Sequence, residues 1–336
     1  MNKLILLTTT ALIAFGTSLP AFADSATITQ TNEVSGTATQ HQPGVFYGGA
    51  TDDLAIIAQV GGTGDTATQE QARLNDINDF ALVGIQSITQ TSNSSAQANQ
   101  FDNGIQDTQT ITQTGTSNST TATQTMDSEF GVQNSQNIVQ NNDSGSSVTQ
   151  NLNGGTGNFN LQTAEQDGQT NSTVSQTITG ATSNNFEFAN QNSTGANNAM
   201  TSLISNGTFN SIHQTQDSGA SNDVQTASIT GSTNSLVEQY QGMGSSSNTQ
   251  TASVDGATTN RALQYQSTGV TNGSQTITQD NAGMFNQAGQ GQGNSGNVAT
   301  ITQSGGQSNI AIQNQGLQST DAGFMFVNGG GVLTHN

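Results

Sequence analysis

Residues 111–124 read Ile-Thr-Gln-Thr-Gly-Thr-Ser-Asn-Ser-Thr-Thr-Ala-Thr-Gln, and this stretch decides the fold because much of the chain repeats its pattern. Each half contains an apolar residue two places before a Gln: Ile111 and Gln113 in the first half, Ala122 and Gln124 in the second. Gly, Ser and Asn, which favour turns, lie between the halves. Residues two apart on a strand share a face. The stretch therefore predicts two short strands joined by a turn, each with its apolar residue and its Gln on one face.

The same pair of motifs recurs, with its two Gln residues ten or eleven places apart, at Gln30 and Gln40, Gln59 and Gln69, Gln90 and Gln100, Gln113 and Gln124, Gln140 and Gln150, and Gln303 and Gln313. The middle of the chain has a stricter period of 25 residues, at Gln166, Gln191, Gln216, Gln241 and Gln266. Periods of this length indicate a solenoid or a related repeat architecture. We therefore predict an all-β fold, a β-solenoid of stacked strand-turn-strand coils with about 22–27 residues per coil.

The inward face of such a coil is predicted to be partly polar. Ile28 should be buried, and alternation along the strand places Gln30 on the same face. A lone buried Gln is costly because its amide loses its hydrogen bonds to water. A column with one Gln per coil lets each amide donate to one neighbour and accept from the other, at a spacing of about 4.7–4.8 Å. We predict an assembly ladder made of the Gln residues named above together with Ile28, Ile111, Asn118, Ala122, Ile301 and Asn309.

The composition agrees with a core that depends little on hydrocarbon. Only 30% of the residues are hydrophobic, against about 45–50% in ordinary globular domains, which argues against a conventional enzyme of this length. Cys is absent, so disulfides and Cys-based zinc sites are excluded. A formal net charge of −19 with three basic residues makes nucleic acids and anionic lipids poor partners. The scattered acids are interpreted as groups that keep the chain soluble.

The N-terminus is predicted to be a secretory signal peptide covering residues 1–23. It has a basic start, an apolar run from Leu4 to Phe15 and a small-residue cleavage site at Ala21-Phe22-Ala23. The apolar run is shorter than the ~20 residues that a spanning helix needs. We therefore expect a secreted, extracellular chain without a transmembrane segment after cleavage.

The repeat resembles that of the curlin family. The family pattern is a Gln, then a Gly, then an Asn five places after the Gln, and a second Gln six places further on; here these are Gln113, Gly115, Asn118 and Gln124. Residues 303–313 are similar but one residue shorter, and Asn309 follows the first Gln by six places. Curlin proteins are the subunits of curli, secreted bacterial fibres with an amyloid core.

The resemblance implies a structural subunit that polymerises with itself by stacking coils at open ends. It implies a cell-surface fibre with a role in biofilm matrix and adhesion. It also implies two further partners, a nucleator subunit and a curli-type outer-membrane secretion channel. We expect no catalytic activity, no cofactor and no metal.

The repeats divide the chain into five parts: the signal peptide at 1–23, curlin-like repeats at 24–150 with an insertion near 42–57, divergent 25-residue repeats at 151–298, a curlin-like repeat at 299–316, and a C-terminal cap or tail at 317–336. In the divergent part, the place of the second Gln is expected to be taken by Thr, as at Thr201 and Thr226. The apolar segment 323–327 is expected to pack on the last coil or to contact a partner.

Two alternative functions use the same fold. Thr-x-Thr motifs such as Thr110/Thr112 and Thr300/Thr302 should face outward, as on the ice-binding face of some antifreeze proteins. Against this, the motif is uneven and fails through most of residues 180–275. The other alternative, a secreted β-solenoid adhesin, would normally carry a large binding module or an export domain, and neither is visible.

The remaining polar groups are interpreted as structural. His41, His213 and His335 have no metal-ligand spacing. The paired acids Asp52 and Asp53, like Asp76 and Asp79, are interpreted as solvated loop residues.

Overall fold

The structure is a computed structural model that describes residues 25–41, 54–71, 84–102, 106–115, 119–127, 132–153, 158–180, 182–192, 194–256, 258–280, 284–316, 324–325 and 334–335. The predicted signal peptide, Asn118 and the acids of the 52–53 and 76–79 segments lie outside the described residues. Most of the predicted C-terminal cap does so too.

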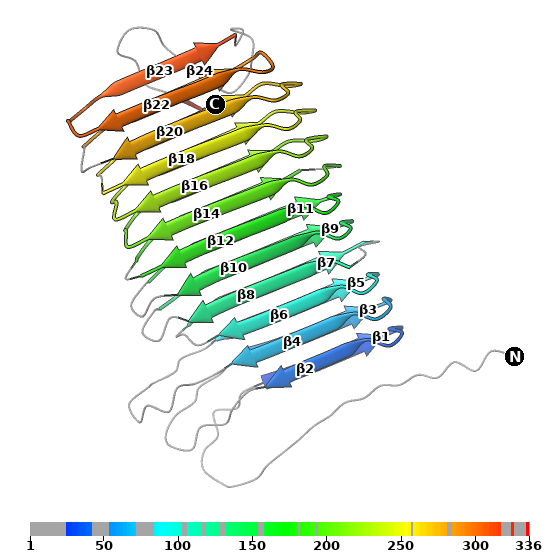
Figure 1. Cartoon of the computed structure of the whole chain (residues 1–336). Helices are drawn as coiled ribbons and strands as arrows, with labels where there is room; N and C mark the ends of the chain where they lie inside the picture. Colours follow the sequence, from blue (N-terminus) through cyan, green and yellow to red (C-terminus); the bar gives the residue numbers. More distant parts are fainter. Residues whose placement is uncertain are drawn as a thin grey trace, which may run out of the picture.

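All the secondary structure that the structure describes is β-strand, and Figure 1 shows two long sheets that run along one axis, one behind the other. The odd sheet has twelve strands: β1 (Ser25–Thr31), β3 (Leu54–Val60), β5 (Ile85–Thr91), β7 (Thr108–Thr114), β9 (Ser135–Asn141), β11 (Leu161–Asp167), β13 (Phe186–Gln191), β15 (Ser211–Gln216), β17 (Leu236–Gln241), β19 (Arg261–Gln266), β21 (Gln287–Gln292) and β23 (Ile310–Gln315).

The even sheet has eleven strands: β2 (Thr37–His41), β4 (Thr66–Gln71), β6 (Gln97–Asp102), β8 (Thr121–Asp127), β10 (Ser147–Asn153), β12 (Thr173–Thr179), β14 (Ala199–Ser205), β16 (Val224–Thr230), β18 (Thr249–Asp255), β20 (Ser274–Asp280) and β22 (Val298–Ser304). Two short strands, β24 (Phe324–Met325) and β25 (Thr334–His335), pair antiparallel with each other.

Within each long sheet, every strand pairs in parallel with the next strand of the same parity. Gln30 of β1 lies opposite Gln59 of β3, and Gln40 of β2 lies opposite Gln69 of β4. One odd and one even strand therefore form a coil; eleven such coils are followed by the half-coil β23. This confirms the predicted all-β solenoid. Both sheets continue without a break past residues 150 and 298, so the divergent central repeats belong to the same stack.

The corners between the strands are stacked as well. Thr208, Thr233 and Thr258, which lie in successive corners, form parallel bridges with one another. Near them, Gly231 has a φ of 59° and Asn234 a φ of 55°. Gly and Asn adopt this left-handed region at little cost. The Gly and Asn residues that mark turns in the sequence therefore let each corner repeat the path of the one before it.

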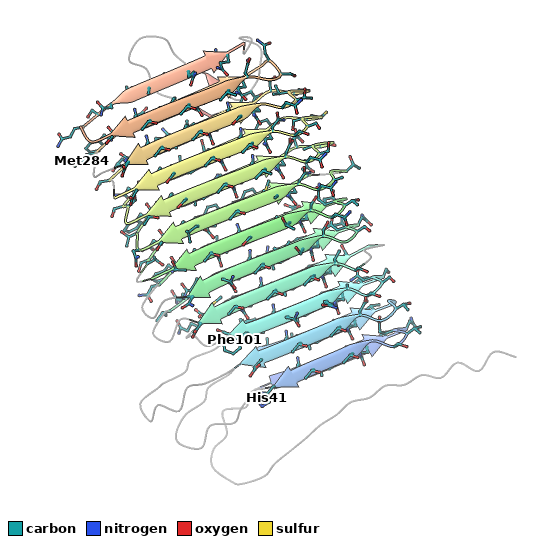
Figure 2. All side chains as sticks on the ribbon, in the orientation of Figure 1. His41, Phe101 and Met284 are labelled. Atoms are coloured by element: carbon teal, nitrogen blue, oxygen red, sulfur yellow. The ribbon has the colours of Figure 1, made fainter. Side chains whose placement is uncertain are left out.

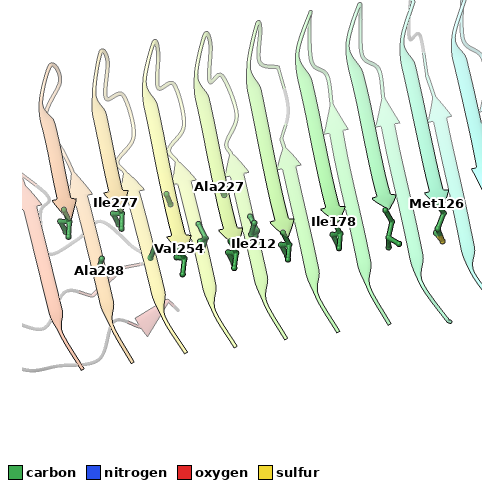
Figure 3. Packing of buried hydrophobic residues seen from close by; sticks show 14 residues of the cluster. Met126, Ile178, Ile212, Ala227, Val254, Ile277 and Ala288 are labelled. Atoms are coloured by element: carbon green, nitrogen blue, oxygen red, sulfur yellow. The ribbon is translucent and has the colours of Figure 1, made fainter. Parts of the chain in front are cut away.

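Side chains alternate between a buried and an outward position along nearly every strand. With Ser25 as the first position of β1 and Thr37 as the first of β2, the second, fourth and sixth positions of each register face the space between the sheets. The coil made of β7 and β8 buries Gln109, Ile111, Gln113, Ala122, Gln124 and Met126. Half of these inward side chains are amides and half are apolar, so the apolar clusters form narrow stripes along the stack (Figure 3).

Three sequence predictions need correction. The insertion predicted near 42–57 is too long, because Leu54 begins β3 and Ile57 occupies a buried position of the repeat. Thr201 and Thr226 do not replace the second ladder Gln; they occupy the outward third position, and Ser202 and Ala227 hold the inward fourth position. The shift arises because seven residues separate Gln191 from Ala199, the first position of β14, whereas six separate Gln166 from Thr173, the first position of β12; β16, β18 and β20 keep the longer spacing.

The third correction concerns the last repeat. Ile301 and Gln303 lie on the even strand β22, whereas Ile111 and Gln113 lie on the odd strand β7. Gln313 lies on the odd strand β23. The two halves of the motif have therefore exchanged sheets at this end, which the spacing of the Gln residues alone did not reveal.

Candidate assembly surface

One column of Gln runs through the whole stack without interruption. It occupies the sixth position of all twelve odd strands and consists of Gln30, Gln59, Gln90, Gln113, Gln140, Gln166, Gln191, Gln216, Gln241, Gln266, Gln292 and Gln315. We call it the unbroken column. In it, each side-chain Nε2 donates to the Oε1 of the next Gln, at distances of 2.6–3.2 Å.

Shorter amide columns stand beside it. In the N-terminal half, Gln40, Gln69, Gln100, Gln124, Gln150 and Gln176 form one column, and Gln86, Gln109, Gln136 and Gln162 form another. In the C-terminal half the columns are Gln214 to Gln313, Gln225 to Gln275, and Gln279 with Gln303. All of these bonds also run from the earlier to the later coil.

The second hydrogen of many of these amides binds the opposite sheet. Gln69 Nε2 donates to the Ile56 carbonyl oxygen at 2.9 Å, and Gln239 Nε2 donates to the Thr226 carbonyl oxygen at 2.9 Å. An amide with both hydrogens and its oxygen bonded avoids the cost of burial without a partner. The columns therefore hold successive coils together and also join the two sheets.

A second kind of ladder occupies the corners before the odd strands from β9 to β23, where Asn precedes each strand except β17, which follows Ser235. Asn160 donates its backbone N–H to Asn134 Oδ1 at 3.0 Å, and Asn185 donates in turn to Asn160 Oδ1 at 3.1 Å. The same contact continues to Asn309, whose N–H donates to Asn286 Oδ1 at 3.0 Å. These bonds fix the start of each strand relative to the coil before it.

Most of the predicted ladder residues fall into these columns. Ile28 and Ile111 share the apolar fourth position of the early odd strands, and Ala122 lies in the second position of β8. Gln303 and Gln313 belong to two different short columns rather than to one motif. The ladder prediction omitted the columns that begin at Gln86, Gln214 and Gln225. Their own 25-residue spacing (Gln214, Gln239, Gln264 and Gln225, Gln250, Gln275) is a signal that could have found two of them.

The two halves meet at a buried carboxyl group. Glu187 occupies the second position of β13, directly after Gln162 in its column, and Gln162 Nε2 donates to Glu187 Oε2 at 2.8 Å. Burial disfavours the charged form and raises the pKa of Glu187 to about 8, while the hydrogen bond from Gln162 offsets part of that effect. A protonated Glu is close in shape to Gln, so the site accommodates the neutral acid as a member of the amide column.

Buried acids also lie at several corners. Asp143 Oδ1 accepts the Gln169 N–H at 2.7 Å, and burial raises the pKa of Asp143 to about 7. Burial also raises the pKa values of Asp65 and Asp223, which accept the backbone N–H groups of Ala96 and Asn248. These carboxyl groups take the place that Asn or Ser has in other coils.

Both ends of the stack are open in the part of the chain that the structure describes. On β1, Gln30 and Ile28 are half-buried, whereas their counterparts Gln59 and Ile57 on β3 are fully buried. At the other end, Ile310 of β23 is 46% exposed and Gln315 is half-buried. Because every Gln-to-Gln bond of the columns runs from the earlier to the later coil, the column residues of the first coil present acceptors and those of the last strand present donors.

No known protein-family model matches the chain, and no curated protein matches it significantly. Among the described residues, no helix is long and apolar enough to cross a membrane. Within the same residues, no three His, Asp or Glu side chains come together as a metal site. The β-solenoid fold is consistent with a repeat structural or adhesin-like protein.

Proposed function

We propose that the protein is a structural subunit of extracellular curli-like fibres, which it forms by stacking its coils end to end with those of other copies. The unbroken column carries this proposal, because a hydrogen-bonded series from the first odd strand to the last can continue into another chain. The resemblance of residues 111–124 and 303–313 to the curlin repeat supports the same function.

The columns also define how two copies would meet. The Gln30 and Gln40 oxygens of one copy face away from its second coil, since both residues donate toward that coil. At the other end, Gln313 and Gln315 accept from β21, and their amide nitrogens can face an added coil. The N-terminal coil of one subunit therefore joins the C-terminal end of the next. The even sheet ends one strand lower, at β22, so β23 makes the first contact.

Open sheet edges are strong sites for adding strands, because a row of backbone groups there lacks partners. Here the incoming β1 also continues the unbroken column, because its Gln30 occupies the same sixth position as Gln315 of β23. Export through a curli-type channel and start of growth on a nucleator subunit form part of this proposal. So does a role of the fibres in biofilm matrix and surface adhesion.

The first test is incubation of the purified, tag-free chain 24–336. Electron microscopy is expected to show fibres that bind thioflavin and give cross-β diffraction with a spacing of about 4.7–4.8 Å along the axis. A chain that stays monomeric and folded through the same incubation would overturn the proposed function.

The second test asks about polarity and uses the absence of Cys from the chain. Thr27→Cys on β1 and Ile312→Cys on β23 occupy the same outward position of the register at opposite ends. Adjacent strands are close enough for a disulfide. Mixed fibres of the two variants should form Thr27→Cys to Ile312→Cys cross-links, and fibres of either variant alone should not. Abundant cross-links in the single-variant fibres would show head-to-head stacking.

A further inference from the structure

The outer surface of the even sheet is unusually uniform. From β6 to β22, the first, third and fifth positions provide 27 outward side chains, of which 19 are Thr or Ser and none is ionisable. We call this surface the threonine face; in Figure 2 the even strands lie toward the viewer. Asp127, Asp255 and Asp280 stand at the rim, each the last residue of its strand, and Asp102 of β6 lies in a buried inward position.

The third position gives the face its central column. Thr or Ser occupies it in ten of the eleven even strands, from Thr39 to Thr300, with Asn99 as the exception. Thr201, Thr226 and Thr251 carry the column through the segment in which the Thr-x-Thr motif fails in the sequence. The column is therefore continuous in space although its motif is not.

The outer surface of the odd sheet shows that solvent exposure alone does not produce this uniformity. Its third position runs through Thr163, Phe188, His213 and Glu238 on four successive strands, and the next member of the series, Leu263, is fully buried. Both surfaces are parallel sheets of the same coils and share the same preference for β-branched residues. The difference between them calls for a requirement that acts on the even sheet only.

We propose that the threonine face is a lateral interface, through which two copies of this chain pack side by side along their solenoid axes. The proposal goes beyond end-to-end stacking, because it uses a surface that runs along the stack instead of its ends. The strands of a second copy repeat at the same spacing, so equivalent side chains of the two faces stay aligned along the whole length.

Charge favours the same occupant. The chain has a formal net charge of −19, so most approaches between copies bring like charges together. The threonine face carries no ionisable group between β6 and β22 and allows contact without a buried charge. Small, uncharged side chains also let two sheets approach to the ~10 Å separation of packed sheets.

The size of the face is sufficient. The nine strands of the face, at a spacing of about 4.8 Å and each about 20 Å long, give about 860 Å² per copy. Two such faces bury about 1,700 Å², close to the standard size of a protein–protein interface.

The experiment compares three forms of the chain 24–336. The face variant carries Thr149→Glu, Thr201→Glu and Thr251→Glu on alternate even strands. The control variant carries Thr110→Glu, Thr163→Glu and Thr215→Glu on alternate odd strands, where these residues are also outward and not buried. Both variants add three negative charges. Urea unfolding verifies that each variant folds, and Lys at the same three positions replaces Glu if a Glu variant does not.

Fibres of the natural chain and of the control variant are expected to have the mass per length of two solenoids. Fibres of the face variant should have half that value. Single-solenoid mass per length in the natural chain, or an equal loss in both variants, would overturn the lateral interface and leave end-to-end stacking intact.

If no form makes fibres, sedimentation of the folded chain tests the interface by itself. The expected result is a dimer for the natural chain and the control variant and a monomer for the face variant, which would support the lateral interface while end-to-end stacking fails. A monomeric natural chain that depresses the freezing point of water below its melting point, with this activity lost only in the face variant, would instead identify ice as the occupant and overturn the proposal.

Discussion

The two halves of the solenoid place the same kinds of side chain at different inward positions. In β7 and β8, amides take the second and sixth odd positions and the fourth even position, as with Gln109, Gln113 and Gln124. In β17 and β18, they take the fourth and sixth odd positions and the second even position, at Gln239, Gln241 and Gln250. Each of these coils nevertheless has three amide and three apolar positions. The numbers of inward amide and apolar side chains per coil are therefore the same in these two coils, while the positions that they occupy differ.

Each start of a new amide column costs free energy, and this cost favours few, long columns. The first Gln of these short columns has no Gln donor in the coil before it. Among the residues that the structure describes, the buried Oε1 atoms of Gln86, Gln214, Gln225 and Gln279 have no hydrogen-bond partner. Such an orphan acceptor costs about 1–3 kcal/mol. The unbroken column has its first acceptor at the open N-terminal end, where another copy can bond it. An uninterrupted Gln column is therefore favoured within one solenoid and also across the junction between two copies.

The largest effect is expected from breaking two columns in one N-terminal coil. Gln113→Ala with Gln124→Ala removes amides that donate to Gln140 and Gln150. The neighbouring amides then lose partners, and we expect a loss of about 2–6 kcal/mol in the free energy of unfolding together with slower assembly. Urea unfolding and thioflavin kinetics measure the two effects.

The matched control for this pair is Thr112→Ala with Thr123→Ala, on the outward positions of the same strands. It should change the free energy of unfolding by less than about 1 kcal/mol. Equal losses in the two double variants would contradict the structural role of the inward amides.

The junction between the halves should make the solenoid sensitive to pH. The folded pKa of Glu187 is about 8 and its ordinary value is 4.5, so between these values the folded chain holds a proton that the unfolded chain has released. Stability therefore falls as pH rises through this window, by about 1.4 kcal/mol per pH unit for such a group. Asp143, with a pKa of about 7, adds to the fall below pH 7.

Glu187→Gln is expected to remove one part of this dependence, because Gln stays neutral and continues the column above Gln162. The urea midpoint of unfolding, measured at pH 5, 6, 7 and 8, should fall less with rising pH in Glu187→Gln than in the natural chain. Glu165→Gln, on an exposed position of β11, is the matched control and should keep the natural slope. A slope unchanged by Glu187→Gln would show that the junction carboxyl group does not titrate in this window.

A smaller effect is expected at the corners. Asn210 Oδ1 accepts the Ser235 N–H at 2.9 Å, and its Nδ2 donates to the Ser232 carbonyl oxygen at 2.8 Å. Asn210→Ala leaves these buried groups without partners and should cost about 1–3 kcal/mol in urea unfolding. Asn190→Ala, on an outward position of β13, should cost less than about 0.5 kcal/mol. A similar cost for both would mean that the corner ladder adds nothing to stability.

The sequence was sufficient to predict the solenoid and the inward Gln, because strand alternation converts the spacing of Ile111 and Gln113 directly into a buried face. It was not sufficient for the register between the sheets. Because of one additional residue before β14, Thr201 faces outward and Ser202 inward, whereas Gln176 faces inward on β12. Gln176 and Thr201 each follow a column Gln by ten residues, so the spacing in the sequence does not distinguish them. The outward Thr-x-Thr motifs were predicted, but the continuity of the threonine face through residues 180–275 was not, since Thr201, Thr226 and Thr251 align with the other Thr residues only after the corners of unequal length are placed.

The smallest effect on the free energy of unfolding is expected from a tyrosine pair on the outward side of the odd sheet, where the two halves also differ. The C-terminal half of the odd sheet carries Tyr240 and Tyr265, stacked with ring centroids 5.1 Å apart, and the Tyr240 hydroxyl group donates to Asp217 at 2.9 Å. Burial, together with the bond to Asp217, raises the pKa of Tyr240 above its ordinary range. Tyr240→Phe keeps the stacked ring and loses only the hydroxyl group, so the cost in urea unfolding should be about 0.5–1.5 kcal/mol. Asp217→Asn should lower the pKa of Tyr240 in an absorbance titration, since the negative charge is removed. If neither variant changes its measurement, the hydroxyl group makes no bond to Asp217 in solution, and the outer surface contributes to the stack through ring packing alone.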